Sequence, residues 1–170
     1  TDGIDIGTEL CCEYADKDYH IPKFFIINMV EKEQANFDSV LSALKERYGR
    51  TIFPFTLPTN QGTGFNKIAD VLRKELFTFK TDGSGNCSSE SPGDDWNQNL
   101  ADLHNELIEL IAESDESLME IFFDKGELSE DELRSGLHEA LKSNGLIPVF
   151  CVDAKSNVGV KRMMDIIAKY

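Results

Sequence analysis

Lys23-Phe24-Phe25-Ile26-Ile27-Asn28 is a short, continuous apolar run that follows Pro22 and does not alternate between polar and apolar residues. Such a run is typical of a β-strand that is covered on both faces, as in a parallel sheet. A second run of this kind spans Leu146 to Val152 near the end of the chain. Helical periodicity surrounds both runs, so the two ends of the chain predict an α/β fold with a parallel sheet.

Amphipathic helices are predicted around these two strands. The spacing of apolar residues predicts a helix over 8–19 that Thr8 caps, a helix over 37–48 and a helix over 157–170. In the last of these, the residues expected to face inward are Val160, Met163, Met164 and Ile167.

The middle of the chain has a different pattern. Pro54 marks 51–57 as an edge strand, because proline cannot donate to a central ladder. The stretches 67–72 and 75–80 are interpreted as two further strands, although 65–77 taken alone also fits a helix.

A long acidic helix follows a loop in this middle region. Residues 81–95 are rich in Gly, Ser, Asp and Pro and predict a mobile loop, after which Trp96 opens an amphipathic helix. A break is expected at Ser114-Asp115, and Ser129 with Glu132 predicts a capping box. The apolar stripe of the long helix consists of Leu100, Leu103, Leu107, Leu110 and Ile111, and its acidic stripe of Glu106, Glu109, Glu113 and Glu116.

The two patterns divide the chain. Residues 1–50 and 146–170 are expected to form part of an α/β core, and 51–145 to form an acidic α+β subdomain inserted between two strands of that core.

Composition narrows the function classes. The chain has 170 residues, 41% of them hydrophobic, which is enough for a real core, and its formal net charge is -14. Phosphate backbones repel such a chain, so non-specific nucleic-acid binding is not expected, whereas a basic protein partner is favoured. The chain has no run of 18 apolar residues, so no membrane span is predicted. The start lacks the basic and apolar regions of a signal peptide. It also lacks an initiator Met, which fits a processed terminus or a boundary within a longer protein.

Cysteine and histidine spacing gives no sign of a disulfide framework or a metal site. The cysteines are Cys11, Cys12, Cys87 and Cys151, and the histidines are His20, His104 and His138. No Cys-x-x-Cys occurs and the histidines lie far apart, so we expect a reducing, cytoplasmic setting and no bound metal. Cys11 and Cys151 are expected to be buried.

Several stretches, in order along the chain, resemble translational GTPases of the elongation factor G family. FIINMVE at 25–31 is similar to the fourth GTPase motif, in which a buried strand ends in Asn-Lys-x-Asp, and ANF at 35–37 resembles the segment that follows it. AESDESLME at 112–120 and GELS at 126–129 resemble the family's inserted subdomain. IPVFC at 147–151 and AKSNVGV at 154–160 resemble the fifth GTPase strand and its guanine loop.

The resemblance implies part of a P-loop-GTPase-like parallel sheet with an inserted subdomain, in a factor that acts in ribosomal translocation. In the family, the fourth-motif aspartate accepts two hydrogen bonds from guanine, the lysine stem packs along the base, and the asparagine ties the loop to its neighbours. Here Asn28 is retained, while Met29 replaces the lysine and Glu31 replaces the aspartate. The fifth motif, Ser-Ala-Lys in the family, is Asp153-Ala154-Lys155.

These departures predict a degenerate guanine site. Glu31 adds a methylene, which moves the carboxylate oxygens by about 1 Å and disturbs a bidentate contact. The Ala154 N–H can still face a guanine carbonyl, whereas Asp153 either repels that carbonyl or points outward. The sequence has no Gly-x-x-x-x-Gly-Lys-Ser/Thr loop, so this chain is expected to hold neither GTP nor Mg²⁺, the ligands of the parent family.

The resemblance also implies a partner. In elongation factor G, carboxylates on the long helix of the inserted subdomain meet the C-terminal domain of the ribosomal stalk protein. Glu109, Glu113 and Glu116 are the corresponding residues here, and spacings of four and three put them on one helix face. We expect a monomeric chain that docks on the ribosome without contacting nucleic acid or membrane.

Other interpretations stay open at this point. The chain could belong to a working GTPase that tolerates Met29 and Glu31 and whose phosphate-binding half lies outside it. It could belong to a release factor or an antibiotic-protection protein, although the long insertion favours elongation factor G. It could also be an acidic interaction module with no role on the ribosome.

Overall fold

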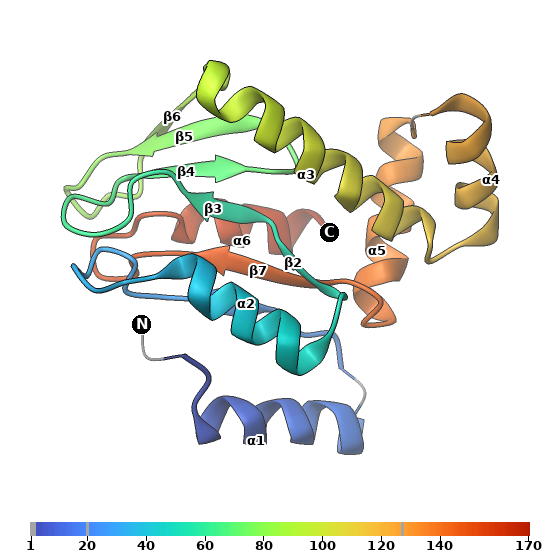
Figure 1. Ribbon diagram of the computed structural model, residues 1–170, viewed down its shortest axis with the longest axis horizontal. Helices are drawn as coiled ribbons and strands as arrows, with labels where there is room; N and C mark the ends of the chain where they lie inside the picture. The colour runs from blue at the N-terminus through green and yellow to red at the C-terminus, as the bar shows by residue number, and fades with distance from the viewer. Residues whose placement is uncertain (1–2, 20, 127) are drawn as a thin grey trace.

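Two sheets and their covering helices make up the chain in a computed structural model that describes residues 3–19, 21–126 and 128–170 (Figure 1). The helices are α1 (Ile6–Tyr14), α2 (Phe37–Tyr48), α3 (Asp94–Ala112), α4 (Glu116–Lys125), α5 (Glu130–Lys142) and α6 (Val160–Lys169). The strands are β1 (Phe25–Ile27), β2 (Ile52–Pro54), β3 (Thr56–Pro58), β4 (Lys67–Asp70), β5 (Glu75–Phe79), β6 (Cys87–Glu90) and β7 (Ile147–Cys151). Thr1, Asp2, His20 and Glu127 lie outside the described residues.

The two apolar runs form neighbouring parallel strands, as their composition predicts. The strand order is β1-β7-β2, and both pairings are parallel, with Phe25 opposite Val149 and Ile52 opposite Ile147. All five residues of β7 are buried, because this strand is central and is covered on both faces. The predicted α/β fold class is confirmed.

A second sheet is antiparallel and has the order β3-β4-β5-β6. Phe55, between β2 and β3, links it to the first sheet, since its N–H donates to the Val149 carbonyl (2.9 Å) and its carbonyl accepts from the Val71 N–H (3.0 Å). β2 lies at the edge of the parallel sheet, where Pro54 is tolerated. The first residues of the range 51–145 therefore belong to the parallel sheet, which corrects the boundary predicted for the insertion.

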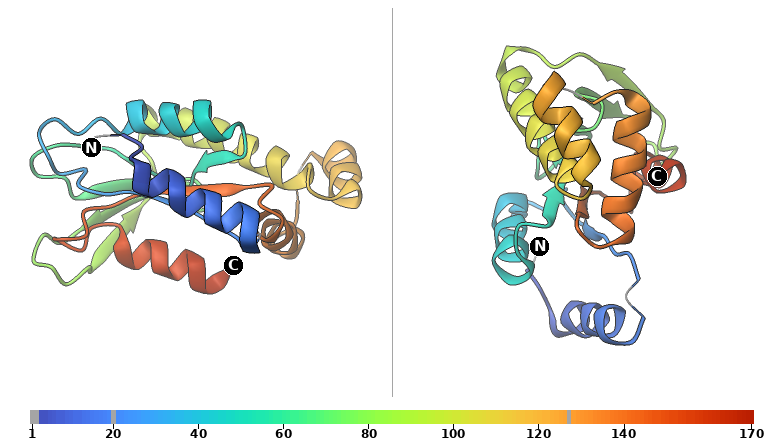
Figure 2. Two further views of the ribbon diagram at one scale, coloured as in Figure 1. Left: turned by 90° about the horizontal axis from the view of Figure 1, so that it is seen from below. Right: turned by 90° about the vertical axis from the view of Figure 1, so that its right-hand side faces the viewer.

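Helices cover the sheets on opposite sides, with α2 and α6 on different faces (Figure 2). Two apolar clusters result. The first joins α2 to β1, β7 and the antiparallel sheet, and the second joins α3, α5 and α6 to the other face. Cys151 is buried in the first cluster as expected, and burial raises the pKa of its thiol to about 12. Cys11 is exposed, and Cys12 occupies the buried position instead.

The first helix begins earlier than predicted. Asp5 rather than Thr8 is its cap, because the Asp5 carboxylate accepts the Thr8 N–H at 2.7 Å. The regular helix ends at Tyr14 and continues as a π-helical turn over Ala15–Tyr19. Cys12 is the only buried residue among the nine residues of α1, all of which are described.

The middle of the chain contains more strand than its sequence indicates. β4 and β5 pair in antiparallel register, so the alternative of a helix over 65–77 is wrong. The predicted loop over 81–95 contains β6, which pairs with β5. All four residues of β6 are exposed, so no hydrophobic pattern marks this strand. α3 begins at Asp94, two residues before Trp96.

The predicted break and capping box in the acidic region are both present. Asp115 lies between α3 and α4 and caps α4, since its carboxylate accepts the Ser117 N–H at 2.8 Å. Ser129 and Glu132 form the capping box of α5. The apolar stripe of α3 is buried at Leu100, Leu107 and Ile111 and is partly buried at Leu103 and Leu110.

The inward face of α6 differs from the predicted one. Met163 and Ile166 are buried, whereas Met164 and Ile167 are exposed. The third buried residue of this face is Arg162, because it has a partner in the core.

A buried ion pair joins α6 to the antiparallel sheet. Arg162 Nε lies 2.5 Å from Asp70 Oδ2, and the two side chains are 8% and 0% exposed. The other Asp70 oxygen accepts the Arg73 N–H at 2.8 Å, and the Arg162 guanidinium lies over the Phe77 ring at 5.5 Å. These contacts satisfy both charges, which burial would otherwise destabilise strongly.

Replacing Arg162 by methionine should lower the free energy of unfolding by about 3–5 kcal/mol, because it leaves the Asp70 carboxylate buried without its counter-charge. The double variant Arg162→Met/Asp70→Leu should lose less than the single one. Urea unfolding measures both. The matched control is Arg50→Met, which removes an exposed pair with Glu113 and should cost at most about 1 kcal/mol. Equal losses in Arg162→Met and Arg50→Met would contradict this role for the buried pair.

Candidate functional site

The loops that follow β1 and β7 lie side by side, because the carboxyl ends of neighbouring parallel strands meet at one edge of a sheet. Asn28 comes directly after β1, and its side-chain oxygen accepts the Ala154 N–H at 3.1 Å. The structure therefore brings together two residues that are 126 positions apart and that the sequence resemblance assigned to one site. The same bond occupies the N–H that was expected to face a guanine carbonyl.

Asp153 lies near the start of the second loop, the one that follows β7. It is 2% exposed, and its Oδ1 accepts the N–H groups of Lys155 (3.0 Å) and Ser156 (3.3 Å). Its backbone also pairs with that of Val158 in both directions. Asp153 thus does not point outward, which corrects one of the two outcomes expected from the sequence, and its carboxylate is bonded within its own loop. The short side chain instead forms a local turn, as aspartate does at many loop starts.

Met29 and Glu31 complete the first loop. Met29 has a φ of 65°, which is uncommon for a residue other than glycine, and its side chain is 42% exposed. Glu31 is partly buried, and one of its carboxylate oxygens, Oε2, is buried without a hydrogen-bond partner. Met29 thus offers an exposed apolar side chain, while the Glu31 carboxylate is only partly open to solvent.

The acidic residues of the predicted docking face are not on one helix. Glu109 is exposed in the last turn of α3, Glu113 is the residue that ends α3, and Glu116 begins α4. Asp115 starts a new helix between them, so the expectation that one helix carries all three is wrong. Glu113 is also paired with Arg50, at 2.8 Å.

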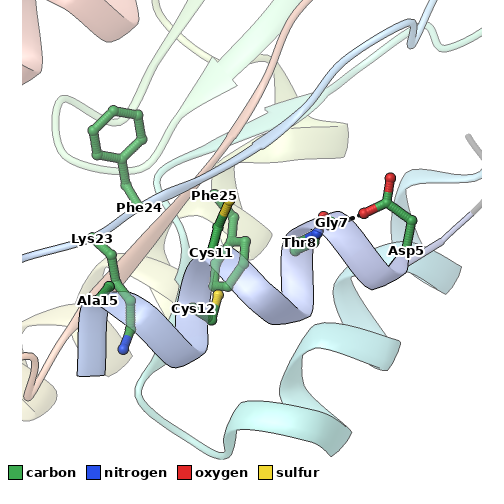
Figure 3. A pocket seen from close by; sticks show the side chains of 9 residues that line it. All are labelled: Asp5, Gly7, Thr8, Cys11, Cys12, Ala15, Lys23, Phe24 and Phe25. Atoms are coloured by element: carbon green, nitrogen blue, oxygen red, sulfur yellow. Dashed lines mark hydrogen bonds between the residues drawn. The ribbon is translucent and has the colours of Figure 1, made fainter. Parts of the chain in front are cut away.

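Two cavities flank β1, and sequence reasoning missed both. One of about 470 Å³ lies between α1 and β1 and is lined by Cys11, Cys12, Lys23, Phe24 and Phe25 among others (Figure 3). The second, of about 290 Å³ and largely apolar, extends from Phe24 to α5 and α6.

Exposure along β1 agrees with these cavities. Phe24 is 43% and Ile26 45% exposed, although the run was expected to be covered on both faces. Among the described strands β1 pairs with β7 alone, so its other edge is free. The signal that could have revealed this surface is the conflict between a central-strand sequence and an edge position.

Metal clusters and membrane helices are both absent from the described part of the chain. Within the described ranges, no three side chains of His, Cys, Asp or Glu lie together as metal ligands would. None of the described helices combines the length and apolarity that a membrane span requires.

No family model matches this sequence. The fold is similar to a crystal structure of a protein from Thermus thermophilus, with a TM-score of 0.87 and 21% sequence identity. The similarity covers 99% of this chain and 24% of that protein, so the chain spans about a quarter of the length of the protein it matches. At this identity the likeness shows the fold alone, with the antiparallel sheet and helices α3 to α5 between β2 and β7.

Replacing Asn28 by alanine should release the Ala154 N–H and speed its hydrogen exchange, with a loss of about 0.5–1.5 kcal/mol in the free energy of unfolding. Exchange measured by NMR at Ala154 tests this. The control is Lys155→Ala, which removes an exposed side chain of the same loop and should leave that exchange unchanged. If Ala154 exchanges at the same rate with and without Asn28, the bond does not tie the two loops.

Proposed function

We propose that this chain is a segment of an elongation factor G-like translation factor that acts in ribosomal translocation, with degenerate guanine-recognition loops and an acidic subdomain that docks on the ribosomal stalk. The observation that carries this proposal is the Asn28–Ala154 bond between two loops at the carboxyl ends of parallel strands. It joins the two motifs that the resemblance identifies, in a fold with the predicted insertion.

The chemistry of the loops supports a loss of guanine selection. The Ala154 N–H is engaged by Asn28, and the Asp153 carboxylate is engaged by its own loop. Met29 carries no charge, and Glu31 reaches further than the aspartate it replaces, which disfavours a bidentate contact. The GTP and Mg²⁺ chemistry of the parent family is therefore not proposed for this chain.

A second candidate is part of a functional, GTP-hydrolysing translational GTPase whose phosphate-binding half lies outside this chain. The free edge of β1 and the cavities on either side of Phe24 favour it, because an added strand would pair with β1 and fill both. The unpartnered Glu31 oxygen also favours it, since a ligand N–H would satisfy that oxygen.

Titration of the chain with a fluorescent guanine nucleotide in the presence of Mg²⁺ should show no saturation at micromolar concentrations, because neither the base nor the phosphates have a complete set of partners. A fluorescent adenine nucleotide is the control for non-specific binding. Micromolar binding of the guanine nucleotide alone would overturn the first candidate and support the second.

The end of α3 supports a docking role for its carboxylates. Glu109 lies in the last turn and Glu113 follows it, and this turn contains no basic residue. Carboxylates near a helix C-terminus are unfavourable, because the last carbonyl groups already carry partial negative charge. An arrangement that reduces helix stability is expected where a charged partner compensates for it. A basic patch on the C-terminal domain of the stalk protein would be such a partner.

Reversing Glu109 to lysine should weaken binding of the stalk-protein C-terminal domain roughly tenfold at low salt and less at high salt, since the charge attracts a basic patch. The same change should raise the stability of the chain by about 0.3–1 kcal/mol, because it removes an acid from a helix C-terminus. Calorimetric titration and thermal unfolding give the two values.

The control is Glu46→Lys, an equal charge reversal at an exposed position on α2. Unchanged affinity in Glu109→Lys would contradict docking through α3. Failure of the unmodified chain to bind either the stalk domain or ribosomes would favour an acidic interaction module without a ribosomal role.

A further inference from the structure

Two tips of the antiparallel sheet reach the two loops of the candidate site. The connection from β3 to β4, the first tip, covers 59–66, and the connection from β5 to β6, the second tip, covers 80–86. Figure 1 shows both at the end of the molecule where the chain leaves β1 and β7. The tips are far in sequence from the loops that they reach. The stretches that resemble the guanine motifs do not include the tips.

The first tip holds the loop after β1. The Gly62 N–H donates to the Val30 carbonyl at 2.8 Å, and the Gln61 side-chain oxygen accepts the Phe37 N–H at 3.1 Å. Phe37 is the first residue of α2, where an N–H has no partner within the helix. Gln61 thus fixes both the start of α2 and the end of the loop that carries Met29 and Glu31.

The second tip holds the loop after β7. The Asn157 side-chain nitrogen donates to the Gly83 carbonyl at 3.3 Å. Gly85 lies so close that a Cβ built on it would be 2.6 Å from that nitrogen. Gly85 has a φ of 67°, so its conformation favours glycine, and a methyl group there would displace the end of the Asn157 side chain.

We propose that the two tips position the loop pair, with Gln61, Gly85 and Asn157 as the positioning residues. Both tips belong to one sheet, in which β4 pairs with β5 from Lys67 opposite Thr78 to Asp70 opposite Glu75. The sheet therefore fixes the distance between the tips, and the tips fix the distance between the loops. The Asn28–Ala154 bond joins the two loops at that distance. The two loops, the two tips and the sheet between the tips therefore form a closed ring of contacts.

The ring has a consequence for regulation of the site. α3 packs on the same sheet, because Leu107 and Ile111 share a cluster with Ala69, Val71 and Leu76. The antiparallel sheet, on which the proposed docking helix α3 packs, thus also sets the geometry of the loops. A partner on α3 and a ligand at the loops would influence each other equally through this sheet, since coupling between two sites is reciprocal. This last step rests on the proposed function, whereas the positioning itself does not.

The test compares two glycine variants that place alanine at a similar positive φ. Gly85→Ala places a methyl group against Asn157, whereas Gly126→Ala, at the end of α4, has a φ of 74° and nothing within 4 Å. Hydrogen exchange of the Ala154, Lys155 and Ser156 amides is measured in both variants without any nucleotide or partner. Gly85→Ala should speed this exchange roughly tenfold relative to Gly126→Ala, as expected when one or two hydrogen bonds are lost. Equal exchange in the two variants would overturn the proposal.

A second pair of variants covers the case in which Gly85→Ala does not fold. Gln61→Ala removes the acceptor for Phe37, whereas Gln61→Glu keeps an oxygen there. Gln61→Ala should speed exchange at Ala154, in the other loop, and Gln61→Glu should restore the slow rate. A purely local role for Gln61 would change the Phe37 amide and leave Ala154 unaffected, which would contradict positioning across the ring. Neither result depends on GTP or stalk binding, so failure here is distinct from failure of the proposed function.

Discussion

The whole arrangement depends on β7, a strand that hydrogen-bonds on both sides and is buried on both faces. Its alternate side chains enter different cores, with Val149 and Cys151 in one cluster and Phe150 in the other. Its end pairs with β1 on one side, with Ile27 opposite Cys151, and is bonded by a side chain on the other, because the Thr56 hydroxyl oxygen accepts the Cys151 N–H at 3.0 Å. Two residues later the Asp153 turn begins. The candidate site is therefore attached to the most constrained strand of the molecule, which suits loops that must hold a defined separation.

Sequence reasoning succeeded where burial determines the pattern and failed where it does not. The unalternating run 146–152 predicted β7 as a covered strand, because such a strand must be apolar throughout. β6 was missed because its exposed side chains carry no period. The inward face of α6 was misjudged because Arg162 is buried with a partner 92 positions away. At the site, motif order predicted the meeting of Asn28 with the second loop, whereas the contact of Gly85 with Asn157 joins segments between which the sequence shows no relation.

The prediction that β1 is a strand is correct, but its position in the sheet differs from the position that its composition predicts. Its composition is that of a central strand, yet it lies at the edge of the described sheet with Phe24 and Ile26 partly exposed. An apolar edge with cavities on both faces is unfavourable in water and is a template for further strand pairing. The two candidate functions thus involve different surfaces. A segment that completes a GTPase would cover the edge of β1, whereas a stalk partner would contact α3, and both could be present in one longer protein.

The two loops of the candidate site have internal partners of their own. The Asp153 carboxylate accepts two N–H groups of its own loop and so forms a turn. The Asn28 side chain accepts the Ala154 N–H and so holds the two loops together. Met29 is the exception, because its positive φ is maintained with no gain visible in the loop itself. Such strain persists only where neighbouring contacts impose it, and the bond from Gly62 to Val30 beside it is one such contact. The loop pair is therefore held from outside by the antiparallel sheet.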